Sequence, residues 1–336
     1  MDYVQMGRSG VRVSRLAFGT MSFGGDADEA TAGALFAACR DAGVNVFDCA
    51  DVYNGGRAEE ILGRLAKGSR DELVLTSKAY FPTGQDPNAR GSSRYHLVRS
   101  VEASLRRLGT DRIDLFFLHR FDPETALEDT LRAVDDLVAQ GKILYLGVSN
   151  FAAWETAKAD QIAAHRGWTR VTALQPMYNL AKRQAEVEIL PMARSEGYAV
   201  FPYGPLGGGL LSGRYARDTR PDSGRLVDNA MYRRRYADAD NYDIAERFTA
   251  LAAEVGVHPV SLAVAWVAAH PGVTAPLLGA RSVEQLRPAL QALDVPMNPE
   301  LHARVAALSP TPPPATDRNE EASGDNYASA LTRPPR

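Results

Sequence analysis

Short apolar runs alternate along the chain with longer segments in which apolar residues recur at helical spacing. Runs rich in Val, Ile, Leu, Phe and Tyr are typical of buried strands, and a period of 3.6 residues is typical of helices packed on one side. The predicted strands are residues 13–18, 44–47, 73–77, 113–118, 143–148, 171–174, 199–203 and 274–278. The predicted helices are residues 29–42, 59–66, 96–108, 125–140, 151–164, 185–195, 242–253 and a last segment after Ser282.

This alternation predicts the α/β class and a single (β/α)8 TIM barrel. Parallel neighbouring strands need a crossover outside the sheet, and eight such units close into a barrel. Glycine supports the same period independently, because it commonly follows the last turn of a helix. Gly43, Gly109, Gly141 and Gly197 each stand just after a predicted helix. Residues 1–308 are therefore expected to form one barrel domain.

Three segments depart from the alternation. Residues 3–6 and 11–13 flank Gly7-Arg8-Ser9-Gly10 and predict an N-terminal β-hairpin at the barrel floor. Residues 205–240 form a long connection after the seventh strand, which is expected to be functional, as a lid. Residues 309–336 begin with several prolines and predict an irregular C-terminal tail. Two alternatives remain for this tail: disorder, or a segment that covers the barrel mouth.

Composition and charge narrow the classes of function. The 336 residues carry 38 Lys and Arg against 41 Asp and Glu, a net charge of −3, so no general field for nucleic acid is expected. No apolar run approaches the roughly 20 residues of a spanning helix, and the first ten residues lack a signal-peptide pattern, which predicts a cytoplasmic protein without membrane association. Cys39 and Cys49 have no zinc-ligand spacing, so no metal is expected and both cysteines are predicted to be buried.

Polar residues follow the predicted strands, where a (β/α)8 barrel carries its reactive groups. Asp48, Lys78 and His119 directly follow the second, third and fourth strands, and Tyr53 lies five residues after Asp48. Because burial of unpaired charge is costly, Asp48 and Lys78 are expected to pair. The lysine is expected to favour the phenolate of a nearby tyrosine and to lower its pKa from about 10. Tyr53 is therefore a candidate general acid.

The order of these residues and of several other motifs resembles the aldo-keto reductase family, from about Val13 to Leu290. The motifs are Phe18-Gly19-Thr20-Met21, Asp48-Cys49-Ala50-Asp51-Val52-Tyr53, Leu118-His119-Arg120, Gly147-Val148-Ser149-Asn150-Phe151, Leu174-Gln175-Pro176-Met177-Tyr178-Asn179, the glycine-rich run 204–213 and the run 278–286. The resemblance implies hydride transfer from a nicotinamide cofactor, usually NADPH, to an aldehyde or ketone. It implies that Tyr53 protonates the forming alkoxide, Lys78 and Asp48 tune Tyr53, and His119 orients the carbonyl.

The resemblance also implies where the cofactor lies. No Gly-x-Gly-x-x-Gly follows a predicted strand, so a Rossmann fingerprint is absent and the dinucleotide is expected on the barrel itself. Ser149, Asn150 and Gln175 match positions that hold the nicotinamide carboxamide, and Tyr203 matches the residue that stacks on the ring. Further residues expected at the cofactor are Gly19, Thr20, Met21, Gly204, Leu206, Gly207, Gly209, Gly279 and Gln285.

Two further sets of residues concern cofactor preference and substrate. Arg281 and Ser282 open the last predicted helix, where they can pair a 2′-phosphate, so NADPH is favoured over NADH. Aromatic and cationic residues beyond the strand ends suit a bulky or cyclic carbonyl compound with a hydroxylated or anionic group, although packing within loops explains them equally well. These candidate substrate residues are Phe23, Tyr80, Phe81, Arg120 and Phe151.

Two other functions remain as alternatives. The first is a cofactor-binding regulatory module on the same fold, as in channel-associated relatives, and partner proteins for it are unknown. The second is a lyase that forms a Schiff base on Lys78, as barrel aldolases do. Asp48 is expected to keep Lys78 charged, which argues against the lyase.

Overall fold

A computed structural model describes residues 1–318 and has eight parallel strands curled into a barrel. The strand order is β10-β3-β4-β5-β6-β7-β8-β9, with every neighbouring pair parallel. A parallel bridge between Tyr203 and Leu277 joins the two outer strands of this order and closes the ring. The predicted (β/α)8 barrel is therefore confirmed. The strands are β3 (Ala17–Gly19), β4 (Val46–Asp48), β5 (Val74–Ala79), β6 (Ile113–Leu118), β7 (Ile143–Ser149), β8 (Val171–Gln175), β9 (Ala199–Val200) and β10 (Leu277–Leu278).

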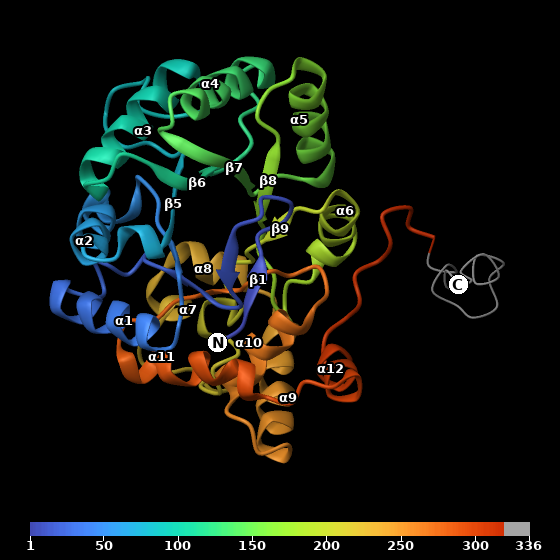
Figure 1. Cartoon of the computed structure of the whole chain (residues 1–336). Coiled ribbons are helices and arrows are strands. Elements are labelled where there is room, and N and C mark those ends of the chain that lie inside the picture. Colours follow the sequence, from blue (N-terminus) through green and yellow to red (C-terminus); the bar gives the residue numbers. More distant parts are fainter. Residues whose placement is uncertain (319–336) are drawn as a thin grey trace.

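Helices cover the outside of the strands, as Figure 1 shows. A continuous core of buried residues, including Leu75, Phe116 and Leu146 from the strands and Leu62, Leu131 and Trp266 from the helices, joins the two layers. The predicted helix ends are correct at Gly43, Gly109, Gly141 and Gly197, which all have positive φ. The helices are α1 (Glu29–Asp41), α2 (Arg57–Ala66), α3 (Arg94–Leu108), α4 (Leu127–Ala139), α5 (Ala153–Arg166), α6 (Ile189–Glu196), α9 (Asp240–Glu254), α10 (Pro259–Ala269), α11 (Val283–Leu290) and α12 (Pro299–Ala306).

The predicted hairpin closes the barrel floor. β1 (Tyr3–Gln5) pairs antiparallel with β2 (Arg12–Ser14), and β1 crosses in front of the barrel strands in Figure 1. Met6 and Val13 have no exposed surface. They pack into the barrel interior with Val46, Val74, Leu115, Phe117, Ala173, Ala199, Phe201, Ala275 and Leu277. Because this end is filled by apolar side chains, a ligand can reach the barrel only from the opposite end.

The predicted strand 13–18 is wrong in its extent, because the structure has parts of two separate strands in this range. β2 ends at Ser14 and β3 begins at Ala17. Between them, the Ser14 hydroxyl donates a hydrogen bond to the carbonyl of Leu16 at 2.6 Å, which closes a local turn. Hydroxyl side chains favour such turns over a continuous strand.

The seventh and eighth strands are also shorter than predicted. β9 covers two residues of the predicted 199–203, and β10 covers two of the predicted 274–278. Pro202 and Pro276 lie inside these ranges and have no N–H to donate to a neighbouring strand, so the regular ladder stops beside them. Tyr203 still reaches the barrel wall through its bridge to Leu277.

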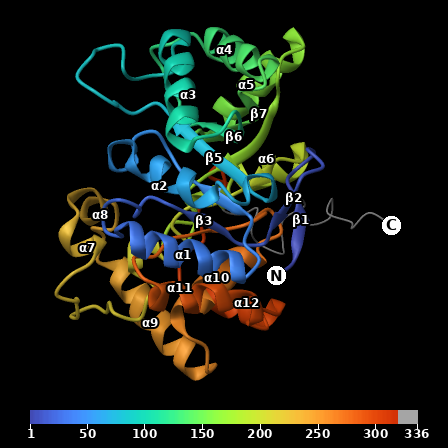
Figure 2. The same ribbon diagram turned by 60° about the vertical axis from the view of Figure 1, so that its left-hand side comes forward.

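Several helices were not predicted. Every residue of α10 from Val260 to Ala268 is buried, so the helix has no polar face and shows no helical period. α12 packs against it, with His302 stacked on Trp266 at 5.4 Å between ring centroids. The connection 205–240 contains α7 (Arg225–Asp228) and α8 (Ala230–Arg235), so it is partly helical. Figure 2 shows α7 and α8 on the side opposite the hairpin, which is the barrel mouth.

The C-terminal segment is only partly described. Residues 309–318 form no helix or strand, as predicted, whereas residues 319–336 lie outside the described residues, and so does any choice between disorder and a cover over the mouth. Within residues 1–318, no single helix is long and apolar enough to cross a membrane. α9 and α10 reach that length and composition only together, and they meet at an angle of 99°.

Candidate active site

A buried ion pair joins the ends of β4 and β5. Lys78 Nζ donates to Asp48 Oδ2 at 2.6 Å, and neither side chain is more than 4% exposed. The second carboxylate oxygen, Asp48 Oδ1, accepts from Thr76 Oγ1 at 2.7 Å and from Gln175 Nε2 at 2.8 Å. Lys78 Nζ also donates to the carbonyl of Cys49 at 2.7 Å. The expected pair is thus present, and its remaining donors and acceptors are satisfied, as a buried pair requires.

Tyr53 lies beside this pair but its acidity differs from the prediction. Lys78 Nζ donates to the Tyr53 hydroxyl at 3.3 Å. Burial raises the pKa of Tyr53 to about 12, and the opposing effect of the Lys78 charge is smaller. The prediction that Lys78 lowers this pKa below its ordinary value is therefore wrong, because desolvation of the phenolate outweighs the nearby cation. Tyr53 holds its proton throughout the neutral pH range, as a proton donor must.

Lys78 is charged and His119 is neutral, and burial acts on the pKa of both. Burial is the largest single effect on the pKa of Lys78 and lowers it, but the charge and hydrogen bond of Asp48, together with Tyr53 and Cys49, outweigh burial. The pKa therefore lies above its ordinary value and the amine stays charged. Burial, together with the charge of Lys78, lowers the pKa of His119 to about 2. His119 is therefore neutral, and a neutral imidazole can donate one N–H to a carbonyl oxygen. Its ring centroid lies 6.1 Å from that of Tyr53 in an edge-on arrangement.

The residues expected to hold the nicotinamide form one hydrogen-bonded group. Ser149 Oγ donates to the carbonyl of Gln175 at 2.9 Å. Asn150 Nδ2 donates to the carbonyl of His119 at 3.0 Å and to Ser149 Oγ at 3.1 Å, and the Tyr203 hydroxyl donates to Asn150 Oδ1 at 2.7 Å. Gln175 Oε1 accepts no hydrogen bond from residues 1–318 and remains available as an acceptor. The structure thus brings these four residues together at the ends of β7, β8 and β9.

The other expected cofactor residues lie on the loops after β3, β9 and β10. Gly204, Gly207 and Gly209 have positive φ, and a Cβ added to Gly204 or Gly209 would meet nothing within 4 Å. The backbone there is open to a ligand. Leu206 is partly buried against the core. At the end of β3, Gly19 is partly buried, and Met21 in the following loop is 36% exposed. Thr20 between them is buried, and its hydroxyl donates to the carbonyl of Asp48 at 2.9 Å. After β10, Gly279 is exposed.

The start of α11 carries the expected phosphate residues. Ser282 is the N-cap, and its Oγ accepts from the backbone N–H of Gln285 at 3.4 Å. Gln285 Oε1 in turn accepts from the backbone N–H of Arg281 at 3.2 Å. The guanidinium of Arg281 forms no ion pair with any residue in 1–318. An arginine without a carboxylate at a helix start is well suited to an anionic group.

Two of the candidate substrate residues face the core. Phe23 has no exposed surface and packs on Phe18, with 5.8 Å between ring centroids, so its assignment as a substrate residue is wrong. The loop after β3 turns inward at this point, which the sequence pattern does not reveal. Phe151 is 7% exposed and packs edge-on against Phe121 at 5.4 Å, so little of its ring is available for contact.

The remaining candidates lie around His119. Phe81 packs edge-on against the His119 ring at 4.9 Å, and Tyr80 packs edge-on against Phe81 at 5.3 Å. Arg120 is exposed and forms no ion pair within residues 1–318. The sequence interpretation missed Trp154, which is 62% exposed and packs on Phe121. Its position shortly after β7 was the available signal.

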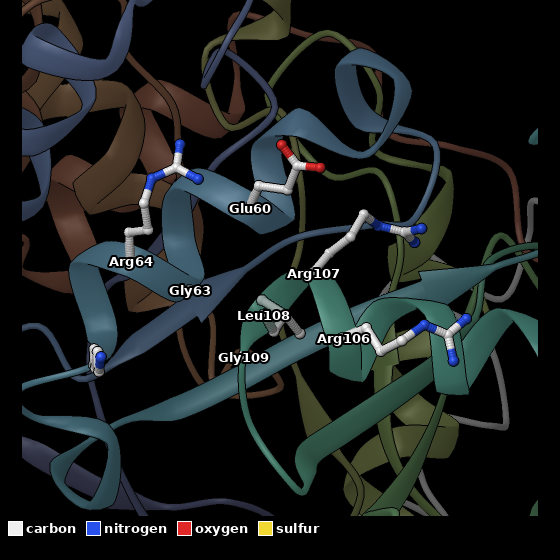
Figure 3. A pocket seen from close by; sticks show the side chains of 8 residues that line it. Glu60, Gly63, Arg64, Arg106, Arg107, Leu108 and Gly109 are labelled. Atoms are coloured by element: carbon white, nitrogen blue, oxygen red, sulfur yellow. The ribbon is translucent and has the colours of Figure 1, made fainter.

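The hollow drawn in Figure 3 is separate from these strand ends. Its volume is about 470 Å³, and it lies between α2 and α3. The lining residues are Glu60, Gly63, Arg64, Lys67, Arg106, Arg107, Leu108 and Gly109. Gly109 caps the C-terminal end of α3, and cations near a helix C-terminus offset its partial negative charge. These cations therefore have a structural explanation without a ligand.

Fold and site together define a (β/α)8-barrel protein with a buried ion pair, a tyrosine and a histidine gathered at its strand ends. The chain matches the family model "Aldo/keto reductase family" over residues 15–310. It is 37% identical over 324 residues to "Uncharacterized oxidoreductase YrpG" of Bacillus subtilis (strain 168), which covers 93% of this chain and 97% of the relative. The chain belongs to the aldo/keto reductase family.

Other relatives carry more specific names. The chain is 37% identical over 326 residues to "Probable voltage-gated potassium channel subunit beta" of Oryza sativa subsp. japonica, covering 94% of this chain and 99% of the relative. It is 31% identical over 327 residues to "Versiconal hemiacetal acetate reductase" of Aspergillus parasiticus, covering 89% of this chain and 94% of the relative. The names include both reductases and a channel subunit, so family membership supports an oxidoreductase without selecting a substrate.

Proposed function

We propose that this protein reduces an aldehyde or ketone to an alcohol with NADPH, and that Tyr53 is the general acid. The observation that carries the proposal is the contact between the protonated Tyr53 hydroxyl and the charged Lys78 Nζ at 3.3 Å, beside the neutral ring of His119. A hydride that reaches a carbonyl carbon creates an alkoxide, and this arrangement supplies a proton, a cation and a neutral donor to that oxygen.

The residues around the strand ends fit a nicotinamide dinucleotide. Gln175 Oε1 is an available acceptor for a carboxamide, since Gln175 Nε2 is held by Asp48. The open backbone at Gly204 and Gly209 leaves room for phosphates, and the guanidinium of Arg281 can pair a 2′-phosphate. When bound, such a dinucleotide supplies the hydride. Ser149 and Asn150 would share the carboxamide with Gln175, and Tyr203 would stack on the ring.

The protein's own residues divide the remaining work. His119 donates a hydrogen bond to the carbonyl oxygen and orients it. Tyr53 gives its proton to that oxygen as charge develops, since a phenol with a pKa of about 12 remains a stronger acid than an alcohol. Lys78 stabilises the phenolate left behind, and Asp48 keeps Lys78 charged. Phe81 covers one edge of His119 and limits the access of water.

The substrate in this proposal is a bulky or cyclic carbonyl compound. Tyr80 and the exposed Trp154 supply aromatic surface near the site, and Arg120 supplies a cation without an ionic partner among residues 1–318. A relative named for the reduction of versiconal hemiacetal acetate is in keeping with this class.

The direct test is consumption of NADPH and of NADH with a panel of aliphatic and aromatic aldehydes and ketones. We expect carbonyl-dependent oxidation of the cofactor, faster at limiting NADPH than at limiting NADH. Absence of turnover with every carbonyl, despite measurable NADPH binding, would contradict the proposal.

That outcome would favour a cofactor-binding regulatory module. The observation in its favour is the likeness to a rice protein named as a potassium channel subunit beta, along 94% of this chain. A Schiff-base lyase is disfavoured, because Lys78 Nζ donates to Asp48, Cys49 and Tyr53 and carries no free electron pair. Borohydride treatment with a carbonyl compound is therefore expected to trap no adduct on Lys78.

A further inference from the structure

The turn that carries Tyr53 has a left-handed backbone over three consecutive residues. In η1 (Tyr53–Gly56), Asn54, Gly55 and Gly56 have φ values of +51°, +65° and +92°. Glycine adopts this conformation freely, and asparagine is among the few other residues that do. Two adjacent glycines give such a turn many alternative conformations. Contacts from other segments must therefore determine where the Tyr53 hydroxyl lies.

On its inner side, the turn packs against Arg107, which pairs with the fully buried carboxylate of Glu59. Glu59 accepts hydrogen bonds from Ser77 Oγ at 2.5 Å and from Arg107 Nε at 2.7 Å, and it has no exposed surface. Arg107, which extends from α3 in Figure 3, packs on Gly56 so closely that a Cβ there would lie 2.8 Å from its Cδ. Loss of Arg107 would leave the buried Glu59 carboxylate without its ionic partner, so these contacts support folding as well as the turn.

On the side of the mouth, the turn is held by Asn54. Its Nδ2 donates to the carbonyl of Met21 at 2.9 Å and to the carbonyl of Phe23 at 2.7 Å, which uses both amide hydrogens. A Cβ added to Gly25 would lie 2.6 Å from Asn54 Oδ1. A side chain at residue 25 would therefore collide with the side-chain amide of Asn54. These contacts join the Tyr53 turn to the loop after β3, which carries Met21 of the expected cofactor group.

We propose that Asn54 is a positioning residue, which ties the general acid to the loop at the cofactor and thereby sets where the Tyr53 proton lies relative to the hydride. The proposal rests on the function proposed above. The Tyr53 hydroxyl lies 3.3 Å from Lys78 Nζ, which is long for a hydrogen bond to a charged group, so a small movement of the turn breaks it. A misplacement of about 1 Å in a reacting group can lower a rate about 100-fold.

The sharpest variant is Asn54→Gly, because glycine adopts the left-handed backbone without strain and removes both hydrogen bonds. We expect kcat to fall at least about tenfold, while KM for the carbonyl and Kd for NADPH change less than about threefold. Asn54→Asp keeps the shape but places a carboxylate against two carbonyl oxygens, so it should lose at least as much. Asn88→Gly, in the exposed loop after β5, is the matched control and should leave kcat unchanged.

Hydrogen exchange supplies a readout that does not depend on turnover. In Asn54→Gly, amides of residues 20–25 and 53–56 should exchange faster together, while those of β5 and β6 stay as in the unsubstituted protein. Unchanged kcat with unchanged exchange would overturn the proposal, and so would a loss of kcat that merely follows a large fall in melting temperature. If the unsubstituted protein reduces no carbonyl, the proposed function fails, but coupled exchange in these two segments still supports the tie and its absence overturns it.

Discussion

The two halves of the barrel mouth differ in how completely their polar side chains are paired by hydrogen bonds and ion pairs. At the ends of β4, β5 and β6, Asp48, Lys78 and Tyr53 are joined by direct hydrogen bonds and are largely removed from water. Around β9, β10 and α8, the backbone is glycine-rich, and Arg235 and Arg281 form no ion pair within residues 1–318. In the first, assembled half, the polar groups are paired with one another. The second, open half presents positive charge that an anionic ligand can neutralise.

The proposed function would use this difference, because it needs both proton donation and dinucleotide binding. Proton donation benefits from groups that are already in place, because no reorganisation is then needed as charge develops. Dinucleotide binding gains from groups that stay unpaired until phosphates arrive, since a guanidinium already paired with a carboxylate would have to break that contact first. Arginines away from the mouth show the contrast, since Arg64 is paired with Glu29 and Arg112 with Asp71.

The largest expected effect comes from removing the proton of the assembled half. Tyr53→Phe keeps the ring against His119 and removes only the hydroxyl, so carbonyl reduction should be abolished while NADPH affinity stays within about threefold. Steady-state reduction and fluorescence titration with NADPH measure the two. Tyr95→Phe, an exposed tyrosine on α3, is the control. Retention of more than a tenth of the activity would remove Tyr53 from the role of acid.

A smaller effect is expected in the open half. Arg281→Ala should raise Kd for NADPH about 10-fold to 100-fold, the range of one lost charge-assisted contact, and should change Kd for NADH less than about threefold. Arg287→Ala, an exposed arginine on the same helix, is the control. Binding titrations with both cofactors give the answer. Equal weakening of both cofactors would show that Arg281 does not distinguish the 2′-phosphate.

The smallest effect concerns Asp51, on the loop after β4 in the assembled half, and is a pH dependence of stability. Burial raises the pKa of Asp51 to about 7, while its Oδ2 accepts from Ser100 Oγ at 2.7 Å. Between its ordinary value near 4 and pH 7, the unfolded chain releases a proton that the folded chain retains, so stability is lost as pH rises. Asp51→Asn should therefore raise the melting temperature by a few degrees at pH 8 and not at pH 4.

Thermal unfolding of Asp51→Asn and the unsubstituted protein at both pH values measures this effect. A constant difference between Asp51→Asn and the unsubstituted protein from pH 4 to pH 8 would mean that Asp51 is ionised in the folded state.

The sequence alone predicted the order of the barrel and the positions of its polar strand ends, because both are local. A strand or helix shows its period within a few neighbouring residues, and Asp48, Lys78 and His119 directly follow such segments. α10 escaped this reasoning because burial on all sides removes the period. The prolines that shorten β9 and β10 are visible in the sequence, but their effect depends on which strand stands beside them.

Tertiary structure decided the burial, the pKa and the hydrogen-bond partners of individual residues, because these depend on segments far apart in the chain. Phe23 lies in the core because of the path of its loop, and the pKa of Tyr53 rises because of what covers it, although Lys78 is where the sequence placed it. The two hydrogen bonds of Asn54 cross more than 30 residues of chain. Burial and through-space contacts depend on segments far apart in the sequence, so a periodic pattern locates the chemistry but does not set its charge state or its geometry.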